Sequence, residues 1–570
     1  MKKKIEILKP NPEIVNKISQ LLNYSEITAT ILANRNITSK KNIFRFLNPS
    51  LKDIRPPLEI KDIDKAVFRI IQAIQNKEKI LIHGDYDVDG ITGTSALIEF
   101  LGYIGGNLLY YIPERINEGY GFQDFHVSSF AIPNEVNLII TVDCGSDSHK
   151  AVDVAKNAGI DVIITDHHEI SENLPSAWAV INPKRKDCAS GLTDLAGVGV
   201  VFYLILSLRK HLREINFWED KIEPNLKNIC DIVALGTIAD VVPLINENRI
   251  IANAGIDVIK KGNNRPGIEA LLENCKIKSS FIRSDDIAFK IAPRLNAAGR
   301  MDHAKNAVEL LTTKCSKTAK KISLFLENLN SERKSVEKEI SNEIVDYLEK
   351  NEQLLEKKTI VLANPKWHLG VLGIVASRLC DKYYKPAVLI AMQNGIGKGS
   401  ARSIPGIDLY AALSECGTYL KKFGGHQAAA GLSIKSEMLS KFQLSFEEAV
   451  SKVSDDEKFI PKLVVDYELN FDSISENLLN EIETMQPFGE SNPEPIFLSR
   501  NVEVKFSKIV GSYHRKMVLY QPETKNQKSI KAVQFNINPN ENLKTRYDEI
   551  FFKLTWNIWN GEKNIEIIVI

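Results

Sequence analysis

Three short apolar runs constrain the fold of this chain more than any other feature. They lie at residues 79–83, 137–142 and 161–165, and each is nearly continuous in aliphatic residues. Strands of a parallel sheet have this pattern when helices cover both faces and leave no side to solvent. Stretches of helical length separate the runs. The sequence therefore predicts βαβ units and a doubly wound α/β sheet over residues 56–245.

Acidic and histidine residues follow each of these runs directly. The first run leads into His83-Gly-Asp85-Tyr-Asp87-Val-Asp89-Gly90, the second into Asp143, and the third into Asp166-His167-His168. In an open parallel sheet, ligands bind beyond the carboxyl ends of the strands, so these side chains are expected to face one crevice. A single aspartate is often a helix N-cap, and a single histidine is often a packed residue. Those alternatives account for one strand end, but not for three together.

So many neighbouring carboxylates require a cation. Like charges a few ångströms apart raise one another's pKa and cost folding free energy, and a divalent metal removes that conflict. Aspartate and histidine form a suitable ligand set for Mn²⁺ or Mg²⁺. The spacing Asp85-x-Asp87-x-Asp89-Gly90 also matches half of an EF-hand calcium loop, but residues 91–96 supply no carboxylate or amide ligand and the motif follows a strand. Taken alone, the motif would also fit an acidic surface turn.

A fourth acidic position lies inside an apolar segment, Ala234-Leu-Gly-Thr-Ile-Ala-Asp240-Val-Val-Pro243. Burial of an unpaired carboxylate is costly, so Asp240 needs a partner, and a metal would supply one. A helix cap or a hydrogen-bonded buried aspartate is the alternative, and the sequence leaves it open.

The pattern of the sequence changes along its 570 residues, a length that predicts several domains. Residues 1–55 are expected to form an N-terminal helical extension, and 56–315 the metal-binding α/β domain. Apolar residues spaced three or four apart predict one long connecting helix within 316–355. A smaller α/β domain is expected at 356–452. Short alternating runs at 455–570 predict a C-terminal β barrel, for which an OB-like barrel is one candidate.

Charge and cysteine content exclude some classes of protein. The formal net charge is +1, so a nucleic-acid partner would need a local basic groove. The seven cysteines form no Cys-x-x-Cys pair, which argues against a zinc site and against a disulfide framework. No apolar run approaches the length of a membrane span, and the basic start does not continue into a signal peptide. We therefore expect a cytoplasmic protein with no membrane partner.

Taken in order, the four acidic elements resemble the motifs of the DHH phosphoesterase superfamily, named for the triplet found here as Asp166-His167-His168. Within it, the chain resembles the RecJ family of single-strand-specific 5′ DNA exonucleases over about residues 50–570. Ser491 and Tyr203 depart from that family's pattern, and neither belongs to the predicted metal set. The departure at Tyr203 weakens any DNA-contact role for that position. The other segments that carry the resemblance are Thr193-Asp-Leu-Ala-Gly-Val-Gly199, Ile291-Ala-Pro-Arg-Leu-Asn-Ala-Ala-Gly-Arg300, Gly399-Ser-Ala-Arg-Ser-Ile-Pro405, Phe423-Gly-Gly-His-Gln-Ala-Ala-Ala-Gly431 and Gln486-Pro-Phe-Gly-Glu-Ser-Asn-Pro-Glu-Pro495.

The resemblance implies a parallel-sheet DHH domain joined by a long helix to a smaller α/β DHHA1 domain, plus an OB-like β barrel. It implies hydrolysis of single-stranded DNA from the 5′ end to 5′ mononucleotides, in DNA recombination and repair. Two Mn²⁺ or Mg²⁺ ions would act, bridged by Asp89 or Asp143, and Asp85, Asp166 and His168 would be catalytic residues around them. The expected metal ligands are His83, Asp87, Asp89, Asp143, His167 and Asp240, and the expected substrate-binding residues are Arg115, Arg294, Asn296, Arg300, Ser400, Arg402, Gly425 and His426.

The expected substrate of this monomeric enzyme is single-stranded DNA, and its expected protein partners are a RecQ-type helicase and a single-strand-binding protein. Two other functions stay open: a DHH enzyme acting on short RNA oligomers, a cyclic dinucleotide or pyrophosphate, and a non-catalytic DHH-like scaffold. The two terminal extensions favour a polymer substrate, and the complete set of acidic and histidine positions argues against a scaffold. Basic residues alternate with aromatic residues at 505–535, which fits a single-strand groove as well as half-buried strands.

Overall fold

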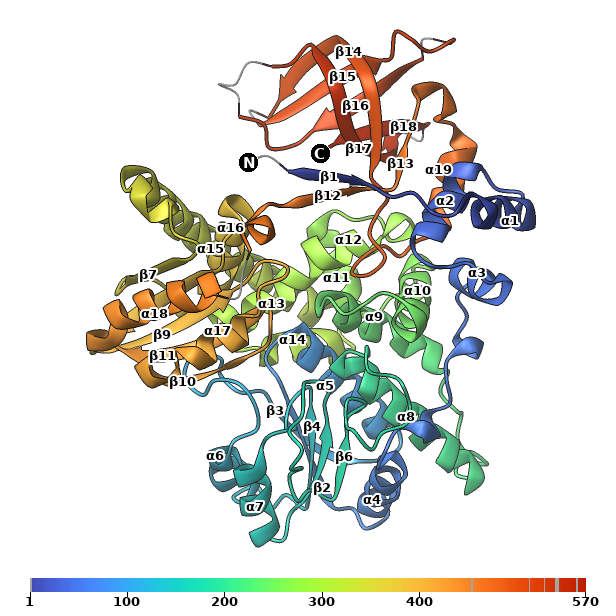
Figure 1. The fold of residues 1–570 in the computed structure, drawn as a ribbon. Helices are drawn as coiled ribbons and strands as arrows, with labels where there is room; N and C mark the ends of the chain where they lie inside the picture. Colours follow the sequence, from blue (N-terminus) through green and yellow to red (C-terminus); the bar gives the residue numbers. More distant parts are fainter. Residues whose placement is uncertain (1–2, 453–454, 512, 527, 539–542, 560–561) are drawn as a thin grey trace. The chain divides into compact units, whose positions relative to one another are not determined.

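The computed structural model describes residues 3–452, 455–511, 513–526, 528–538, 543–559 and 562–570. Beyond the first three residues, these form two compact units (Figure 1). The first unit contains Pro56–Val242 and Gly255–Pro461. The second contains Lys4–Arg55, Pro243–Ala254 and Lys462–Ile570.

A five-stranded, fully parallel sheet in the order β3-β2-β4-β5-β6 forms the first layer of the first unit. Helices α5 and α8 cover one face of this sheet, and α7 packs on the other (Figure 1). The parallel α/β domain predicted from the three apolar runs is thus confirmed. The bounds are β2 Lys79–Gly84, α5 Val88–Tyr103, β3 Asn107–Tyr111, β4 Leu138–Val142, α7 His149–Asn157, β5 Asp161–Thr165, β6 Ala179–Ile181 and α8 Gly197–Glu214.

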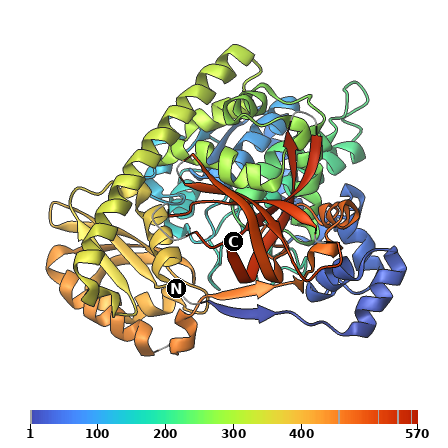
Figure 2. The ribbon, with the colours of Figure 1, turned by 90° about the horizontal axis from the view of Figure 1, so that it is seen from above.

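The long helix predicted from apolar spacing is α15, Ser316–Lys350, with 35 residues. Its buried residues include Leu326, Ile340 and Ile344, and it packs on helices of the α/β domain and on α16 of the smaller domain (Figure 2). The other helices of the first unit before α16 are α4 Ile63–Gln75, α6 Asp124–His126, α9 Cys230–Ala239, α11 Pro266–Cys275, α12 Ser284–Asp286, α13 Ala292–Met301 and α14 Lys305–Thr312, while α10, Asn246–Lys260, contributes to both units.

The smaller α/β domain has a mixed five-stranded sheet in the order β10-β11-β9-β8-β7. The hairpin between β8 and β9 turns at Asn394-Gly395, where both residues have positive φ, as a type I′ turn requires. This hairpin brings the Gly399–Arg402 segment onto a central strand. The bounds are β7 Ile360–Asn364, α16 Leu369–Tyr383, β8 Ala387–Gln393, β9 Ile396–Arg402, α17 Leu409–Glu415, β10 Leu420–Gly425, β11 Ala429–Lys435 and α18 Leu439–Lys452.

A closed β barrel dominates the second unit. Its strands follow the order β14-β15-β16-β18-β17, and β17 pairs back with β14, as in an OB-like barrel. The N-terminal segment, expected to be helical, holds α1–α3 and also strand β1, which pairs with β12. The bounds are β1 Lys4–Ile7, α1 Pro12–Leu22, α2 Glu26–Asn34, α3 Lys40–Leu47, β12 Lys462–Val465, β13 Tyr467–Glu468, α19 Glu476–Glu483, β14 Phe497–Val510, β15 His514–Tyr520, β16 Ser529–Gln534, β17 Arg546–Trp559 and β18 Glu562–Val569.

Among the helices of the described residues, none has the length and apolar character that crossing a membrane requires.

Candidate active site

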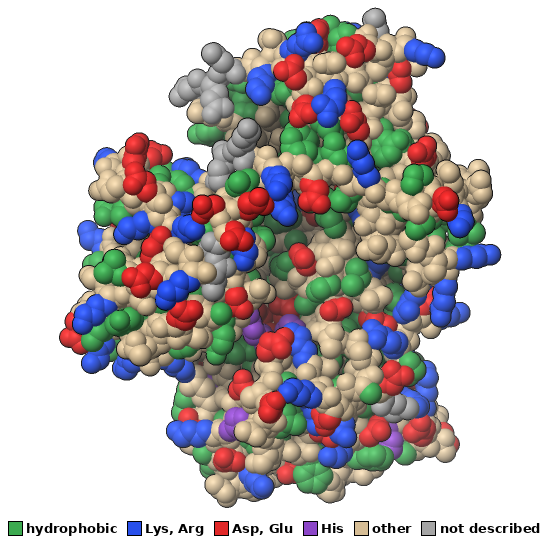
Figure 3. All heavy atoms as spheres, viewed as in Figure 1, with side chains coloured by type: hydrophobic (Ala, Val, Ile, Leu, Met, Phe, Trp, Pro, Cys, Tyr) green, Lys and Arg blue, Asp and Glu red, His purple; other side chains and the backbone are tan. Residues whose placement is uncertain are grey.

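Three aspartates lie in one row at the carboxyl edge of the parallel sheet. They follow β2, β4 and β5, and each aspartate amide donates to the last residue of the neighbouring strand, at 3.1 Å for Asp85, 2.9 Å for Asp143 and 3.1 Å for Asp166. The hydrogen-bond ladder thus continues one residue past each strand and places these residues at one level. The crevice that the sequence predicts at this edge is present, and Figure 3 shows acidic and histidine side chains at the bottom of a hollow.

Acidic and histidine side chains come together there in three groups among the described residues. In each group the possible ligand atoms lie within 4.8 Å of one another. The groups are Asp85, Asp87 and Asp143; Asp89, His167 and Asp240; and Asp143, His167 and His168.

Asp143 lies where these groups meet. His167 Nε2 is 3.2 Å from Asp143 Oδ1 and 3.5 Å from Asp240 Oδ2. Asp143 also belongs to the group that Asp85 and Asp87 form. Its backbone has φ 61°, a left-handed conformation that non-glycine residues rarely adopt and that often marks functional sites. Asp143 belongs to two of the three groups, whereas Asp89 belongs to one.

The cluster contains polar atoms that have no hydrogen-bond partner among the described residues and that are suited to bind divalent metal ions. Asp85 Oδ1, Asp143 Oδ1 and His167 Nε2 are buried and have no hydrogen-bond partner in the described part of the chain. Burial first, and repulsion from Asp87 next, raises the pKa of Asp85 well above its usual range and that of Asp89 to about 7. Burial lowers the pKa of His167 to about 3, which leaves a neutral ring able to ligate a metal. Oxygen and imidazole donors in this arrangement suit Mn²⁺ or Mg²⁺.

Helix ends hold the remaining carboxylates in place. Asp87 caps α5 by accepting a hydrogen bond from Gly90 N at 3.1 Å. Asp89 accepts from Gly197 N at 2.6 Å and Val198 N at 2.8 Å, which are the first amides of α8. Asp240 follows the last residue of α9, where the helix dipole disfavours an anion unless a cation is near. Helix capping, which the sequence left open as the alternative for a single aspartate, therefore applies to Asp87, and Asp87 also belongs to one of the possible ligand groups.

The structure gives His83 a different place from the metal-ligand position we expected. It lies outside all three groups of the described residues, whereas Asp85 lies inside one. His83 is fully buried, and its ring stacks on Tyr111 at a centroid distance of 5.8 Å. Its Nε2 lies 3.2 Å from His126 Nδ1. Burial first, then the nearby His126, lowers the pKa of His83 to about 3, so the ring is neutral.

Asp166 and His168 form a partly buried ion pair beside the cluster. His168 Nδ1 lies 2.8 Å from Asp166 Oδ1, which also accepts from the amides of His167 and His168. Burial opposes the charge on His168, but the hydrogen bond to Asp166 and the surrounding carboxylates outweigh it and raise its pKa to about 9. The same bond holds the pKa of Asp166 below its usual range, against the effect of burial. These interactions therefore favour the charged form of His168.

Arginines from both domains of the first unit converge near this cluster. Burial first, then repulsion from the guanidinium groups of Arg115, Arg333 and Arg402, lowers the pKa of Arg300 to about 9. Arg300 donates to Gly370 O at 3.0 Å, and Arg402 donates to Ser400 Oγ at 3.2 Å. Guanidinium groups that repel one another form a binding site for an anion.

The other expected substrate-binding residues fall into two groups: some contact residues of the site, and one forms an ion pair with α15 instead. His426 stacks on His168 with ring centroids 5.6 Å apart, and Gly425 has φ 146°, so the smaller domain reaches the histidine pair. Asn296 accepts from Val88 N at 3.2 Å and supports the metal-binding loop. Arg294 instead pairs with Glu327 on α15 and donates to Lys290 O.

Three residues that the sequence did not single out complete the site. Tyr120 places its hydroxyl 3.0 Å from His168 Nδ1 and 3.2 Å from Asp143 O. Glu118 and His126 lie behind it, with His126 Nε2 3.3 Å from Glu118 Oε2. The sequence carries no signal for them except their place in the segment after β3.

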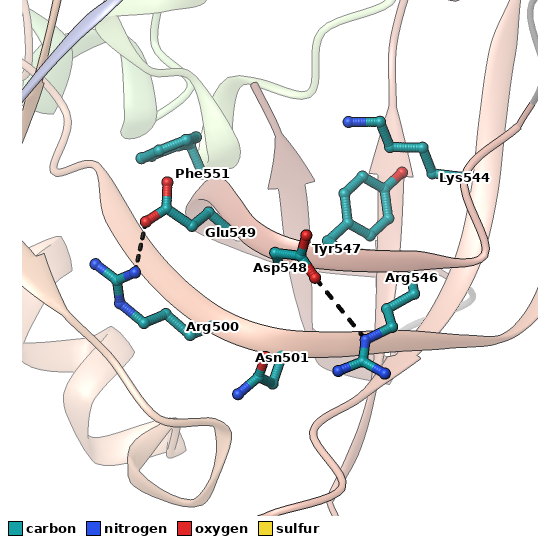
Figure 4. Close-up of a pocket in the computed structure, with 8 residues that line it drawn as sticks. All are labelled: Arg500, Asn501, Lys544, Arg546, Tyr547, Asp548, Glu549 and Phe551. Atoms are coloured by element: carbon teal, nitrogen blue, oxygen red, sulfur yellow. Dashed lines mark hydrogen bonds and ion pairs between the residues drawn. The ribbon is translucent and has the colours of Figure 1, made fainter.

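A hollow on the barrel is a weaker candidate. Ion pairs across it join Arg500 to Glu549 at 2.5 Å and Arg546 to Asp548 at 3.9 Å (Figure 4). These pairs already balance much of its charge, and we assign it no function. Its other lining residues are Asn501, Lys544, Tyr547 and Phe551.

Comparison with known proteins agrees with this geometry. Residues 79–237 match the DHH family N-terminal domain, 356–452 the DHHA1 domain and 465–570 the RecJ OB domain. The single-stranded-DNA-specific exonuclease RecJ of Haemophilus influenzae is 36% identical over 92% of this chain and 92% of its own length. The RecJ of Bacillus subtilis is 34% identical over 99% of this chain and 70% of its own length.

The chain belongs to the RecJ family. The crystal structure of RecJ from Thermus thermophilus in complex with Mn²⁺ matches the whole chain with a TM-score of 0.82, at 26% identity and over 79% of that protein. The same protein in complex with Mg²⁺ matches with a TM-score of 0.76, also at 26% identity, over all of this chain and 78% of that one. The cofactor predicted from the carboxylates, Mn²⁺ or Mg²⁺, agrees with these RecJ structures.

Proposed function

We propose that this chain is a metal-dependent exonuclease that degrades single-stranded DNA from the 5′ end to 5′ mononucleotides, in recombination and repair. One observation carries the proposal. Two neighbouring ligand groups, connected by the 3.2 Å distance between Asp143 Oδ1 and His167 Nε2, lie in the same unit as a convergent group of arginines. The first arrangement suits phosphodiester hydrolysis, and the second suits the binding of a phosphate.

Asp85, Asp87 and Asp143 would hold one ion, and Asp89, His167, Asp240 and Asp143 the other. Asp85 replaces His83 in this assignment, because its carboxylate is part of a ligand group. Two bound divalent ions supply Lewis acidity on the scissile phosphate and lower the pKa of a bound water. The chain itself fixes the ligand geometry through the amides of α8 and the strand-end ladder.

His168 and Asp166 would act on the substrate phosphate directly. The His168 imidazolium, held by Asp166, is a charged donor within 3.7 Å of Asp143, beside the metal set. It stabilises negative charge on a non-bridging phosphate oxygen and needs no reorganisation during the reaction.

Arg115, Arg300, Arg402 and Ser400 would bind the terminal 5′ phosphate. That group carries more negative charge than an internal diester, so a cluster of guanidinium groups distinguishes the two. A strand anchored by its 5′ phosphate beside the metals loses one nucleotide per cleavage. Arg294 is not part of this set, because it forms an ion pair with Glu327.

The RecJ relatives are single-stranded-DNA-specific exonucleases, which supports single-stranded DNA as the substrate. We further propose that the protein acts as a monomer in the cytoplasm, with a RecQ-type helicase and a single-strand-binding protein as partners. Pull-down of purified candidates with the full chain tests the partners separately from the chemistry.

Digestion of single strands labelled at the 5′ or the 3′ end tests the function. With Mn²⁺, we expect early release of labelled mononucleotide from the 5′ end only, and no release in EDTA. Arg402→Ala should weaken the preference for a 5′ phosphate over a 5′ hydroxyl, whereas Arg213→Ala, an exposed arginine paired with Glu223, should not. Release from the 3′ end, or cleavage of dinucleotides alone, would contradict the proposal.

A further inference from the structure

Residues 112–123, between β3 and α6, bring two side chains to the proposed site. Arg115 lies over the ring of Tyr86 at 4.8 Å, next to the metal-binding motif. Tyr120 reaches His168 and Asp143 through its hydroxyl, while its ring stays half exposed. A DNA end can contact both side chains and the proposed metal site at the same time only if Arg115 and Tyr120 keep their positions.

Glu118 is the centre of the contacts that hold this segment. Its Oε1 accepts from the Tyr111 hydroxyl at 2.9 Å, and its Oε2 accepts from Glu114 N at 3.1 Å. The backbone adds one turn, in which Glu118 N donates to Glu114 O at 2.8 Å. The carboxylate of Glu118 therefore ties the start of the segment, beside Arg115, to the last residue of β3.

His126 connects this carboxylate to β2. Its Nδ1 accepts from Gln123 N at 3.0 Å, so that nitrogen carries no proton and Nε2 carries one. Nε2–H donates to Glu118 Oε2 at 3.3 Å, and His83 Nε2 lies 3.2 Å from His126 Nδ1. Side-chain contacts therefore run from Glu118 through His126 to His83.

We propose that Glu118 and His126 are positioning residues that hold Arg115 and Tyr120 over the metal cluster. His83 lies in β2, two residues before Asp85, so the connection fixes the segment relative to a proposed metal ligand. Lys398 of β9 donates to Ile116 O at 3.2 Å, which also links the segment to the smaller domain. The inference rests on the proposed function and assigns to His83 the support of His126 instead of metal binding.

Glu118→Ala, with Glu135→Ala as the matched control, tests this role. Glu135 is an exposed glutamate of the same domain, with 89% of its side chain exposed. For Glu118→Ala we expect kcat/KM on 5′-phosphorylated single strands to fall by about 10- to 100-fold, since small misplacement of binding groups has effects of that size. The ratio of rates on 5′-phosphate and 5′-hydroxyl strands should approach one. The Mn²⁺ concentration for half-maximal activity should stay at the wild-type value.

Glu118→Gln keeps one side-chain oxygen that accepts hydrogen bonds. It should therefore retain more of the end preference than Glu118→Ala, which a general loss of structure would not explain. Tyr111→Phe removes only one hydroxyl contact to Glu118 and should reduce the end preference less than Glu118→Ala. This variant also serves if Glu118→Ala fails to fold.

Wild-type end preference in both Glu118→Ala and Tyr111→Phe, or in a folded Tyr111→Phe alone, overturns the inference. A changed Mn²⁺ requirement in Glu118→Ala also overturns it, because the residue would then support the metals. Failure of the proposed function is distinguishable, since it would appear in the wild-type protein as absent 5′-end release.

Discussion

Asp143 illustrates how single residues determine the chemistry of this site. It is almost completely buried, and burial first, then Asp89 and Asp87, raises its pKa well above the usual range. Gly197 packs so closely that a Cβ there would lie 2.8 Å from Asp143 Oδ1. Burial and the neighbouring carboxylates therefore disfavour the charged form of Asp143, and the same effects on Asp89 make the metal-free protein sensitive to pH.

The unfolding free energy of the metal-free protein should fall as pH rises from about 4 to about 7. The pKa of Asp89 is raised from 3.8 to about 7 in the folded state, so the folded protein binds more protons than the unfolded one across this window. Saturating Mn²⁺ replaces those protons, so its effect on Tm should be larger near pH 7 than near pH 5. Thermal unfolding with EDTA or Mn²⁺ measures both. An Asp143→Asn control should show a shallower dependence, and an equal Mn²⁺ effect at both pH values would contradict the argument.

Asp166→Asn should raise the Mn²⁺ concentration for half-maximal activity by about 10- to 100-fold, the range for residues that orient metal ligands. The neutral amide no longer holds the charge on His168, and it accepts more weakly from the amides of His167 and His168. Asp147→Asn is the control, since Asp147 is exposed on the same edge of the domain. Wild-type Mn²⁺ dependence in Asp166→Asn would show that Asp166 does not orient His167.

Sequence reasoning predicted the crevice but exchanged the places of His83 and Asp85 in it. The end of strand β2, which falls between the two residues, explains the difference. His83 is still within β2, on the same face as Leu81, which packs in the core toward α7. Asp85 follows the strand, where side chains turn into the crevice. A motif of alternating polar residues does not reveal at which residue a strand ends, so spacing alone could not decide between them.

At the scale of elements, helices α5 and α9 bring proposed metal ligands together by close packing. A Cβ at Gly236 of α9 would lie 2.2 Å from Thr92 Oγ1 and 3.1 Å from Asp89 Oδ1. Gly236→Ala should therefore separate the two helices, lower Mn²⁺ affinity and reduce stability by about 1–3 kcal/mol. Gly102→Ala on α5 is the control, because its Cβ would meet nothing closer than 3.8 Å. Metal titration and urea unfolding distinguish the two variants, and equal values for both would refute the packing argument.

Elements with strong local signals were predictable, and those that depend on distant contacts were not. Helix α15 matches the predicted helix because its apolar spacing is long and regular. Strand β1 was missed, since its pairing with β12 joins residues more than 400 positions apart and its four residues are mostly exposed. Propensity over four residues does not identify such a strand.

The second unit shows that the whole molecule is not a linear series of domains. Val15 and Ile31 of the N-terminal helices share one apolar core with Phe497 and Phe552 of the barrel. Buried Arg249, from the middle of the chain, donates to Phe46 O at 2.9 Å and also to Gln486 O and Pro487 O. Deletion of the barrel would expose this core, so point variants on its surface are the better test of DNA binding.

Lys508→Ala with Lys516→Ala should weaken single-strand binding without changing the metal centre. The two lysines are exposed and directly opposite on β14 and β15, and like charges in that register destabilise a sheet unless an anion lies between them. Exposed Phe506 lies on the same face, where a base can stack. Because each phosphate contact on a single strand contributes about 0.7 to the slope of log K against log salt, the double variant should reduce that slope by about 1.4. Binding to a labelled oligonucleotide at several salt concentrations measures this slope.

Lys435→Ala with Lys452→Ala is the control, since each of these lysines lies near a glutamate. The Mn²⁺ requirement and the turnover at saturating DNA should stay unchanged, and a slope equal to that of the control would exclude this face from DNA binding.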